Sequence, residues 1–96
     1  MQVVITPKAK SNLKKLNKVS QILIIERLKK LEVGIPTIGV EKLVGYKNAF
    51  RIRVGNYRVV YRIIDRKIYV VLIGHRKDVY EKLKRLFGWE NSTPWF

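Results

Sequence analysis

The feature that most constrains the fold of this chain is the stretch FRIRVGNYRVVYR, residues 50–62. Apolar and polar residues alternate on both sides of Gly55-Asn56, a dipeptide that suits the turn of a β-hairpin. Successive side chains of a strand point to opposite faces of a sheet. The stretch therefore predicts two antiparallel strands, about 49–54 and 57–64, with one apolar face and one basic face.

Extending the alternation through a turn at Asp65-Arg66 into a third strand, 67–74, assigns the side chains to the two faces. The apolar face receives Phe50, Ile52, Val54, Tyr57, Val59, Tyr61, Ile63, Ile68, Val70 and Leu72. The basic face receives Arg51, Arg53, Arg58 and Arg62, with Val60, Ile64, Tyr69, Val71 and Ile73. Arg53 lies opposite Arg58 in this register, and such a like-charged pair costs about 0.2–1 kcal/mol.

Two interpretations of the basic face are open. The arginines could form a solvated face whose aliphatic stems cover apolar neighbours. Alternatively they bind an anion, because arginine makes paired hydrogen bonds to phosphate and is weakly hydrated. The use of arginine at all four positions, while lysine is abundant elsewhere in the chain, favours the anion.

The overall charge supports a polyanionic partner. Lysine and arginine number 21 against 7 acidic residues, which gives a net charge of +14 and a pI near 10.4. A field of this sign attracts nucleic acid first, then acidic protein, then an anionic membrane surface.

The 96 residues predict one domain, 1–88, with a C-terminal tail, 89–96. The chain has no cysteine, and we see neither a signal peptide nor a run of apolar residues long enough to span a membrane. We therefore expect a cytoplasmic protein with no membrane partner.

The remaining segments predict helices around the sheet. Residues 1–5 suit a first strand, and Thr6-Pro7 suits the start of a helix. A second helix is expected to start near Ser20 and to end before Gly34, with an apolar stripe that includes Ile22, Ile25, Leu28 and Leu31 and is widened by Leu23 and Ile24. A short strand is possible at 42–44. Asp78, with Glu81 three residues later, suits the start of a last helix ending at Gly88. Helices before a sheet indicate an α+β fold.

The stretch GHRKDVYEK, residues 74–82, follows the third strand and carries the remaining candidate functional groups. His75 is the only histidine, and beside several arginines and Tyr80 it is a candidate acid–base group. The carboxylates show no metal-ligand spacing, and we find no phosphate-binding glycine loop. We expect no metal and no cofactor, so phosphodiester chemistry would use the 2′-hydroxyl of RNA as nucleophile.

The motif R-I-R-V-G-x-Y-R-V-x-Y of residues 51–61, preceded by Tyr46 and followed by G-H-R-x-x-V-Y at 74–80, resembles the RelE/ParE superfamily of toxins. The resemblance covers residues 1–87. It implies an N-terminal strand and a helix hairpin packed on a three- to four-stranded antiparallel sheet, followed by a C-terminal helix. It also implies a toxin of a type II toxin–antitoxin system, which cleaves messenger RNA in the ribosomal A site and is held inactive by a cognate antitoxin.

The family's active residues match Arg51, Arg53, Arg58, Arg76 and Tyr80, and some relatives carry a histidine that would match His75. The best-known form has Lys-x-Lys where this chain has Arg-x-Arg, and arginine is no general base at neutral pH. Proton abstraction is therefore expected from His75, Tyr80 or Lys77.

Further contacts to RNA are expected from Arg62, Lys77, Lys47 and Tyr69. Two alternatives to the nuclease stay open. One is a ParE-like inhibitor that acts by binding gyrase, and the other is a non-catalytic basic module that binds nucleic acid.

Overall fold

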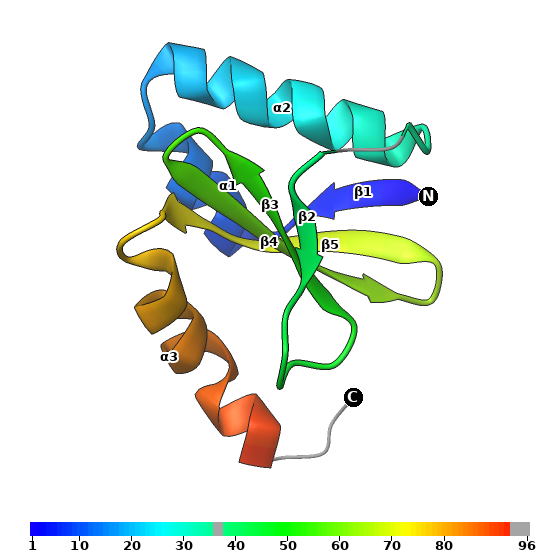
Figure 1. Ribbon diagram of the computed structural model, residues 1–96, viewed down its shortest axis with the longest axis vertical. Coiled ribbons are helices and arrows are strands. Elements are labelled where there is room, and N and C mark those ends of the chain that lie inside the picture. The colour runs from blue at the N-terminus through cyan, green and yellow to red at the C-terminus, as the bar shows by residue number, and fades with distance from the viewer. Residues whose placement is uncertain (36–37, 93–96) are drawn as a thin grey trace.

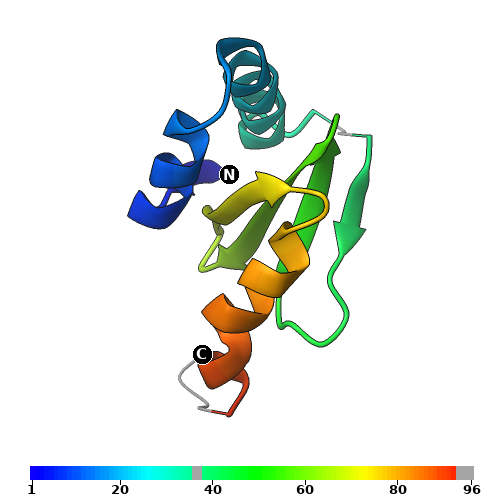
Figure 2. The same ribbon diagram turned by 90° about the vertical axis from the view of Figure 1, so that its left-hand side faces the viewer.

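The computed structural model describes residues 1–35 and 38–92, with side chains through residue 86. The elements follow in the order β1 (Gln2–Ile5), α1 (Pro7–Lys14), α2 (Lys18–Glu32), β2 (Val40–Lys42), β3 (Ala49–Val54), β4 (Tyr57–Ile64), β5 (Lys67–His75) and α3 (Val79–Ser92). One five-stranded sheet has the order β1-β5-β4-β3-β2. The hairpin of α1 and α2 packs on one face of the sheet and α3 on the other (Figures 1 and 2). We call these the hairpin face and the α3 face.

The sheet confirms the predicted hairpin and adds two edge strands to it. Arg53 pairs with Arg58 and Val54 with Tyr57 across the turn, as the alternation predicts. The antiparallel part of the sheet, β2 to β5, has four strands, within the predicted three to four, and the predicted N-terminal strand β1 joins it by pairing in parallel with β5. The short strand β2 pairs antiparallel with β3 and lies at 40–42, not at 42–44.

Helices α1 and α2 each begin after a residue whose side chain accepts a hydrogen bond from a backbone N–H of the first turn. The Thr6 hydroxyl accepts a hydrogen bond from the Ala9 N–H at 3.3 Å, which confirms the predicted start of α1. Helix α2 begins at Lys18, earlier than predicted, because the Asn17 side chain accepts from the Ser20 N–H at 2.8 Å. Helix α3 continues through Gly88, the predicted end, to Ser92. One glycine costs a helix only about 1 kcal/mol relative to alanine, so it need not end one. The last part of the predicted tail, 93–96, lies outside the described residues.

The larger core lies between the sheet and the helix hairpin. Its buried members are Ala9, Leu13, Ile24, Leu28, Ile52, Val54, Val59, Tyr61, Ile68, Val70 and Ile73. Four residues of the predicted stripe of α2 pack on this core, Ile24, Ile25, Leu28 and Leu31. The prediction is wrong for Ile22 and Leu23, which are exposed. The hydrophobic pattern did not show which apolar residues of α2 the sheet would cover, because the helix is apolar on more than one side.

A bulge in β5 corrects the predicted assignment of side chains to the two faces. Val60 pairs with Leu72 and Tyr61 with Val70, which leaves Val71 as an extra residue. Beyond this point the alternation of β5 is reversed. Leu72 therefore joins the core under α3 and Ile73 the core under the hairpin, the opposite of the prediction.

The core under α3 is smaller and consists of Leu43, Ala49, Val60, Leu72, Val79 and Leu83. It occupies part of the face that the sequence predicts as basic, so arginines and α3 share this side of the sheet. No described helix is long and apolar enough to cross a membrane.

Candidate functional site

Four arginines converge at the end of the α3 face that lies near the β3–β4 turn. Arg51 and Arg53 belong to β3, and Arg58 belongs to β4 directly opposite Arg53. Arg76 follows β5, and its backbone N–H donates to the Asn56 carbonyl at 2.8 Å, beside the same turn. The charges of Arg51, Arg53 and Arg76 all contribute to lowering the pKa of Arg58, so the four side chains share one electrostatic environment. We call Arg51, Arg53, Arg58 and Arg76 the arginine cluster.

Arg58 is the member of the arginine cluster whose pKa is shifted by its surroundings. Its Nη1 donates to the carbonyl of Gly55 at 3.1 Å and to that of Tyr57 at 3.0 Å. Its Nε is buried without a hydrogen-bond partner among the described residues. Burial, followed by the like charges around it, lowers the pKa of the guanidinium. Desolvated positive charge with an unused donor is a cost that a bound anion would offset.

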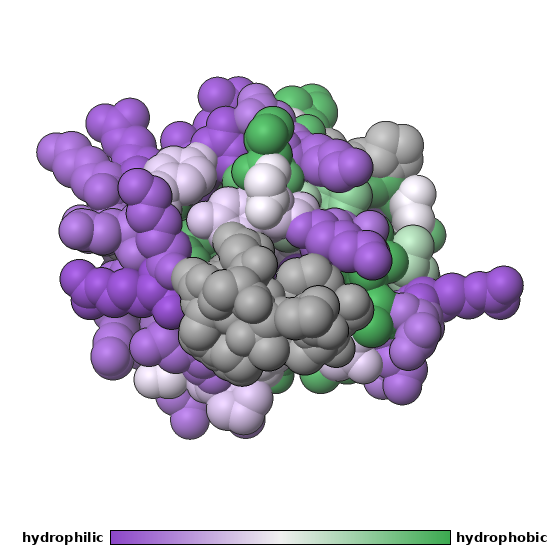
Figure 3. All heavy atoms as spheres, turned by 90° about the horizontal axis from the view of Figure 1, so that it is seen from below, coloured by the Kyte–Doolittle hydropathy of each residue, from purple (hydrophilic) through white to green (hydrophobic). Residues whose placement is uncertain are grey.

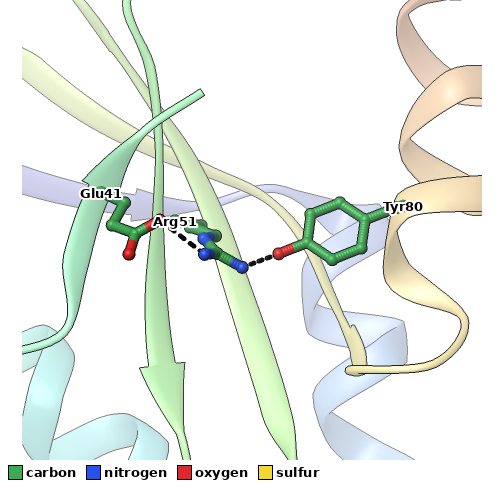
Figure 4. A network of polar contacts seen from close by, with 3 residues as sticks. All are labelled: Glu41, Arg51 and Tyr80. Carbon is green, nitrogen blue, oxygen red and sulfur yellow. Dashed lines mark hydrogen bonds and ion pairs between the residues drawn. The ribbon is translucent and has the colours of Figure 1, made fainter. Parts of the chain in front are cut away.

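Arg51 connects the cluster to the edge strand and to α3 (Figure 4). Its Nη2 lies 2.5 Å from Glu41 Oε2 on β2, and its Nη1 donates to the Tyr80 hydroxyl on α3. The Arg51 Cζ is also 5.6 Å from the centroid of the Tyr80 ring. The strands β2 and β3 and the helix α3 thus bring a carboxylate, a cation and a phenol together.

Glu41 is the site residue that the sequence analysis missed. Its hydrogen bond and ion pair with Arg51, with smaller contributions from Arg53 and Arg58, lower the pKa of its carboxyl group. It is therefore ionised at neutral pH. The alternation of residues 40–42 could have indicated it, but the predicted edge strand began one residue too late to pair Glu41 with Arg51.

His75 lies on the hairpin face and not beside the arginines. It pairs with Tyr57, and the two rings meet edge to face with centroids 5.8 Å apart. The bulge in β5 reverses the side of the sheet on which His75 was expected. Its Nδ1 accepts from the Lys77 N–H at 3.2 Å, so the neutral ring carries its proton on Nε2.

The predicted RNA contacts are distributed over the molecule. Arg62 is only 5% exposed and pairs with Ala49 and Tyr69. It lies four residues along β4 from Arg58, about 13 Å at the usual rise of a strand, but only two residues from Val60, the cross-strand partner of Arg51. Arg62 and Tyr69 therefore lie beyond Arg51, on the side of the cluster away from Arg58. Lys47, in the β2–β3 loop, and Lys77, next to Arg76, are both exposed.

Among the residues that the structure describes, no group of three or more histidine, cysteine, aspartate or glutamate side chains could hold a metal ion. The site itself brings together guanidinium groups, one carboxylate and one phenol. Such a set can bind a phosphate, accept a proton and donate one.

Comparison with known proteins identifies the family. Residues 3–80 match the family described as the ParE toxin of the type II toxin-antitoxin system parDE. The chain belongs to the RelE/ParE family of toxins of type II toxin–antitoxin systems. A curated relative, toxin RelE3 of Methanocaldococcus jannaschii, is 39% identical over 44 residues, which are 46% of this chain and 50% of the relative. The chain thus spans about half the length of the curated relative that it matches.

Solved structures show the same fold. The RelB-RelE complex from Methanococcus jannaschii gives a TM-score of 0.73 at 23% identity and covers 82% of this chain and 96% of that one. The RelE-RelB complex from Pyrococcus horikoshii gives 0.67 at 28% identity, with coverage of 78% and 93%. The YoeB-YefM complex from Staphylococcus aureus gives 0.63 at 24% identity, with coverage of 78% and 95%. The RelE-like fold that the resemblance implied is confirmed.

Proposed function

We propose that this toxin is a metal-independent endoribonuclease that cleaves messenger RNA on the ribosome, in the cytoplasm. The observation that carries the proposal is the convergence of Arg51, Arg53, Arg58 and Arg76 on one end of the α3 face. A single anion there would meet several guanidinium groups, of which Arg58 has an unused buried donor. Since positive charge placed before the reaction stabilises developing negative charge, this arrangement suits a phosphoryl transition state.

In the proposed reaction, the 2′-oxygen of a ribose bonds to the adjacent phosphorus and the bond from phosphorus to the 5′-oxygen breaks. The products are a 2′,3′-cyclic phosphate and a 5′-hydroxyl. Negative charge grows on the phosphate oxygens as the two bonds exchange. The arginine cluster binds these oxygens more tightly in the transition state than in the substrate, and this difference accelerates the step.

One proton must leave the 2′-hydroxyl and another must reach the 5′-oxygen. We assign the first to Glu41, because it is an ionised acceptor within the cluster. Its lowered pKa makes it a weak base, so the arginines would supply most of the acceleration. Tyr80 accepts a hydrogen bond from Arg51, which leaves its own O–H available to the leaving group. His75 lies on the other face of the sheet and takes neither role.

A cognate antitoxin is the proposed protein partner. The RelE-like proteins from Methanococcus jannaschii and Mycobacterium tuberculosis were crystallised with an antitoxin, and the YoeB protein from Staphylococcus aureus with YefM. The positive charge of this chain favours an acidic partner.

The test is primer extension on messenger RNA, free and on programmed ribosomes, with protein that was treated with EDTA and then freed of it before the assay. We expect cuts in the A site on ribosomes alone. Arg58→Ala should reduce the cleavage rate about 100-fold or more, with a much smaller loss of ribosome binding. Arg85→Ala, which removes the same charge from the exposed side of α3, is the matched control and should cleave normally.

The same assay tests the proton acceptor. Glu41→Gln should lose about 100-fold or more in rate, whereas His75→Gln should retain activity. The gyrase inhibitor is the second candidate, because the matching family is that of ParE toxins. Absence of cuts on free and ribosome-bound RNA would remove the nuclease proposal, and a gyrase supercoiling assay would then test the second candidate.

A further inference from the structure

A pocket lies between α1 and α3, at the edge of β5 beyond the end of β1. The strand β1 pairs with β5 only over Lys67–Val70. There the N–H and the hydroxyl of Thr6 both donate to the Val70 carbonyl, at 3.1 and 2.8 Å, and the chain then leaves the sheet to form α1. The rest of this edge of β5 lies with α1 on one face of the sheet and α3 on the other (Figure 2).

The pocket has a volume of about 300 Å³ and combines an apolar floor with a cationic rim. Leu72 and Leu86 form the floor, since Leu72 belongs to the core under α3 and Leu86 packs against that core. The rim consists of three exposed side chains, Lys8 in the first turn of α1 and Lys82 and Arg85 on α3. We call these five residues the interhelix pocket. Figure 3 shows hydrophilic side chains gathered on the side of the molecule where α1 and α3 lie.

The rim of the interhelix pocket gathers three positive charges around one small cavity. Within the described part of the chain, none of Lys8, Lys82 and Arg85 forms an ion pair. The described residues that line the pocket include no acidic side chain. Like charges around a cavity repel one another and attract an anion into it, so an anionic ligand would stabilise this arrangement.

The interhelix pocket is separate from the arginine cluster. Val79 faces the sheet from α3 and is completely buried. At 3.6 residues per turn, Tyr80 then projects from one flank of α3, where it contacts Arg51. Lys82 and Arg85 project from the opposite flank. A ligand in the interhelix pocket therefore lies on the other side of α3 from the proposed phosphate site.

The chemistry and the size of the interhelix pocket together indicate the ligand. Ammonium and guanidinium groups bind phosphate through charge-assisted hydrogen bonds, and one guanidinium can donate two of them to the same phosphate. The leucine floor offers no hydrogen-bonding group and suits an apolar surface such as the face of a nucleobase. Small-ligand pockets span about 300–1,000 Å³, so this one suits a compact anion better than the long chain of a lipid.

We propose that the interhelix pocket binds a free mononucleotide. The phosphate lies between Lys8, Lys82 and Arg85, and the base packs on Leu72 and Leu86. This site goes beyond the proposed nuclease activity and does not depend on it. The ligand contacts both α1 and α3, so its binding joins the two helices across the edge of β5 and raises the midpoint of thermal unfolding.

The experiment is a titration of the whole, ¹⁵N-labelled protein with adenosine 5′-monophosphate, followed by nuclear magnetic resonance. We expect the amide signals of Lys8, Lys82 and Leu86 to shift together with a single dissociation constant. Inorganic phosphate and adenosine, which each lack one half of the ligand, should both bind about tenfold or more weakly than the nucleotide.

Two double variants with the same change in net charge test where the phosphate lies. Lys8→Ala/Lys82→Ala should weaken binding about tenfold to 100-fold, because two charged donors to the phosphate are lost. Lys10→Ala/Lys14→Ala is the matched control, since it removes two exposed lysines of α1 that do not line the pocket, and it should bind like the wild type. All four lysines are exposed, so both variants should fold.

Three results would overturn the proposal. Equal losses in the two double variants would mean that the nucleotide responds only to the net charge. Shifts confined to residues 55–58 would place the anion at the arginine cluster alone. Shifts of the pocket signals with a short single-stranded RNA but not with the mononucleotide would mean that the pocket serves an RNA chain. Cleavage on ribosomes enters none of these measurements, so the nuclease proposal can fail without affecting this one.

Discussion

The two faces of the sheet use the same strands for different purposes. Ile52 and Arg53 are neighbours on β3, yet Ile52 is completely buried under the helix hairpin and Arg53 is exposed on the α3 face opposite Arg58. The hairpin face is apolar along its length and is covered by two helices. The α3 face divides into a small core and the arginine cluster. Burial on one face thus stabilises strands that carry opposed like charges on the other.

Replacement on the hairpin face should give the largest change in stability. Ile52→Ala removes a fully buried side chain from the larger core and leaves a cavity there. We expect the free energy of unfolding to fall by about 2–5 kcal/mol. Urea denaturation followed by circular dichroism measures this loss. A loss well below that range would mean that the hairpin face does not carry most of the stability.

The neighbouring residue on the other face should behave in the opposite way. Arg53→Ala relieves the repulsion with Arg58, so the free energy of unfolding should stay constant or rise by up to about 1 kcal/mol. If the proposed function holds, cleavage on ribosomes should fall about 100-fold, because one positive charge is lost from the proposed phosphate site. Arg53→Lys, which keeps the charge but not the paired hydrogen bonds, should be intermediate in cleavage. If Arg53→Ala were less stable than the wild type and fully active, Arg53 would serve stability and not cleavage, which would contradict the role assigned to the α3 face.

The smallest effect is expected at the edge of the α3 face, in the pH dependence of stability. Arg51 lowers the pKa of Glu41 below the usual 4.5, so the folded state binds this proton less tightly than the unfolded state. The stabilising contribution of Glu41 is therefore present above pH 4.5 and is lost as the pH falls through the lower pKa of the folded protein.

Thermal unfolding of the wild type and of Glu41→Gln between pH 6 and pH 3 measures this contribution. The wild type should lose stability more steeply below about pH 4.5, and high salt should reduce the difference between the two proteins. Parallel curves would show that the contact between Glu41 and Arg51 does not contribute in solution.

Local patterns predicted much of the fold. The hairpin at Gly55-Asn56 and the cap at Thr6 depend on residues close together in the chain, and both are confirmed. The parallel pairing of β1 with β5 joins segments more than 60 residues apart, so no pattern of neighbouring residues predicts it. The outward position of Ile22 and Leu23 was also missed, since a helix that is apolar on two sides does not show which side the sheet will cover.

The candidate site divides in the same way. The placement of Arg51, Arg53 and Arg58 on one face follows from alternation within a single hairpin. The position of His75 does not, because one extra residue at the bulge reverses every side chain that follows it in β5. The position of Glu41 in the site was also missed, because it depends on the pairing of β2 with β3. That pairing places Glu41 beside Arg51, ten residues further along the chain, and Arg51 lowers the pKa of its carboxyl group.

By itself, then, the sequence determined the chemical character of this protein, which is strongly basic and has strands in which arginines alternate with apolar core residues. Alternation along a strand and the capping of helices act over a few residues, so the chain alone specifies them. The tertiary structure decided which groups meet. In the folded protein Glu41 and Tyr80 contact Arg51, His75 lies on the opposite face of the sheet from the arginine cluster, and the outer side of α2 is exposed. These outcomes depend on register, a bulge and packing between distant segments, which only the folded chain determines.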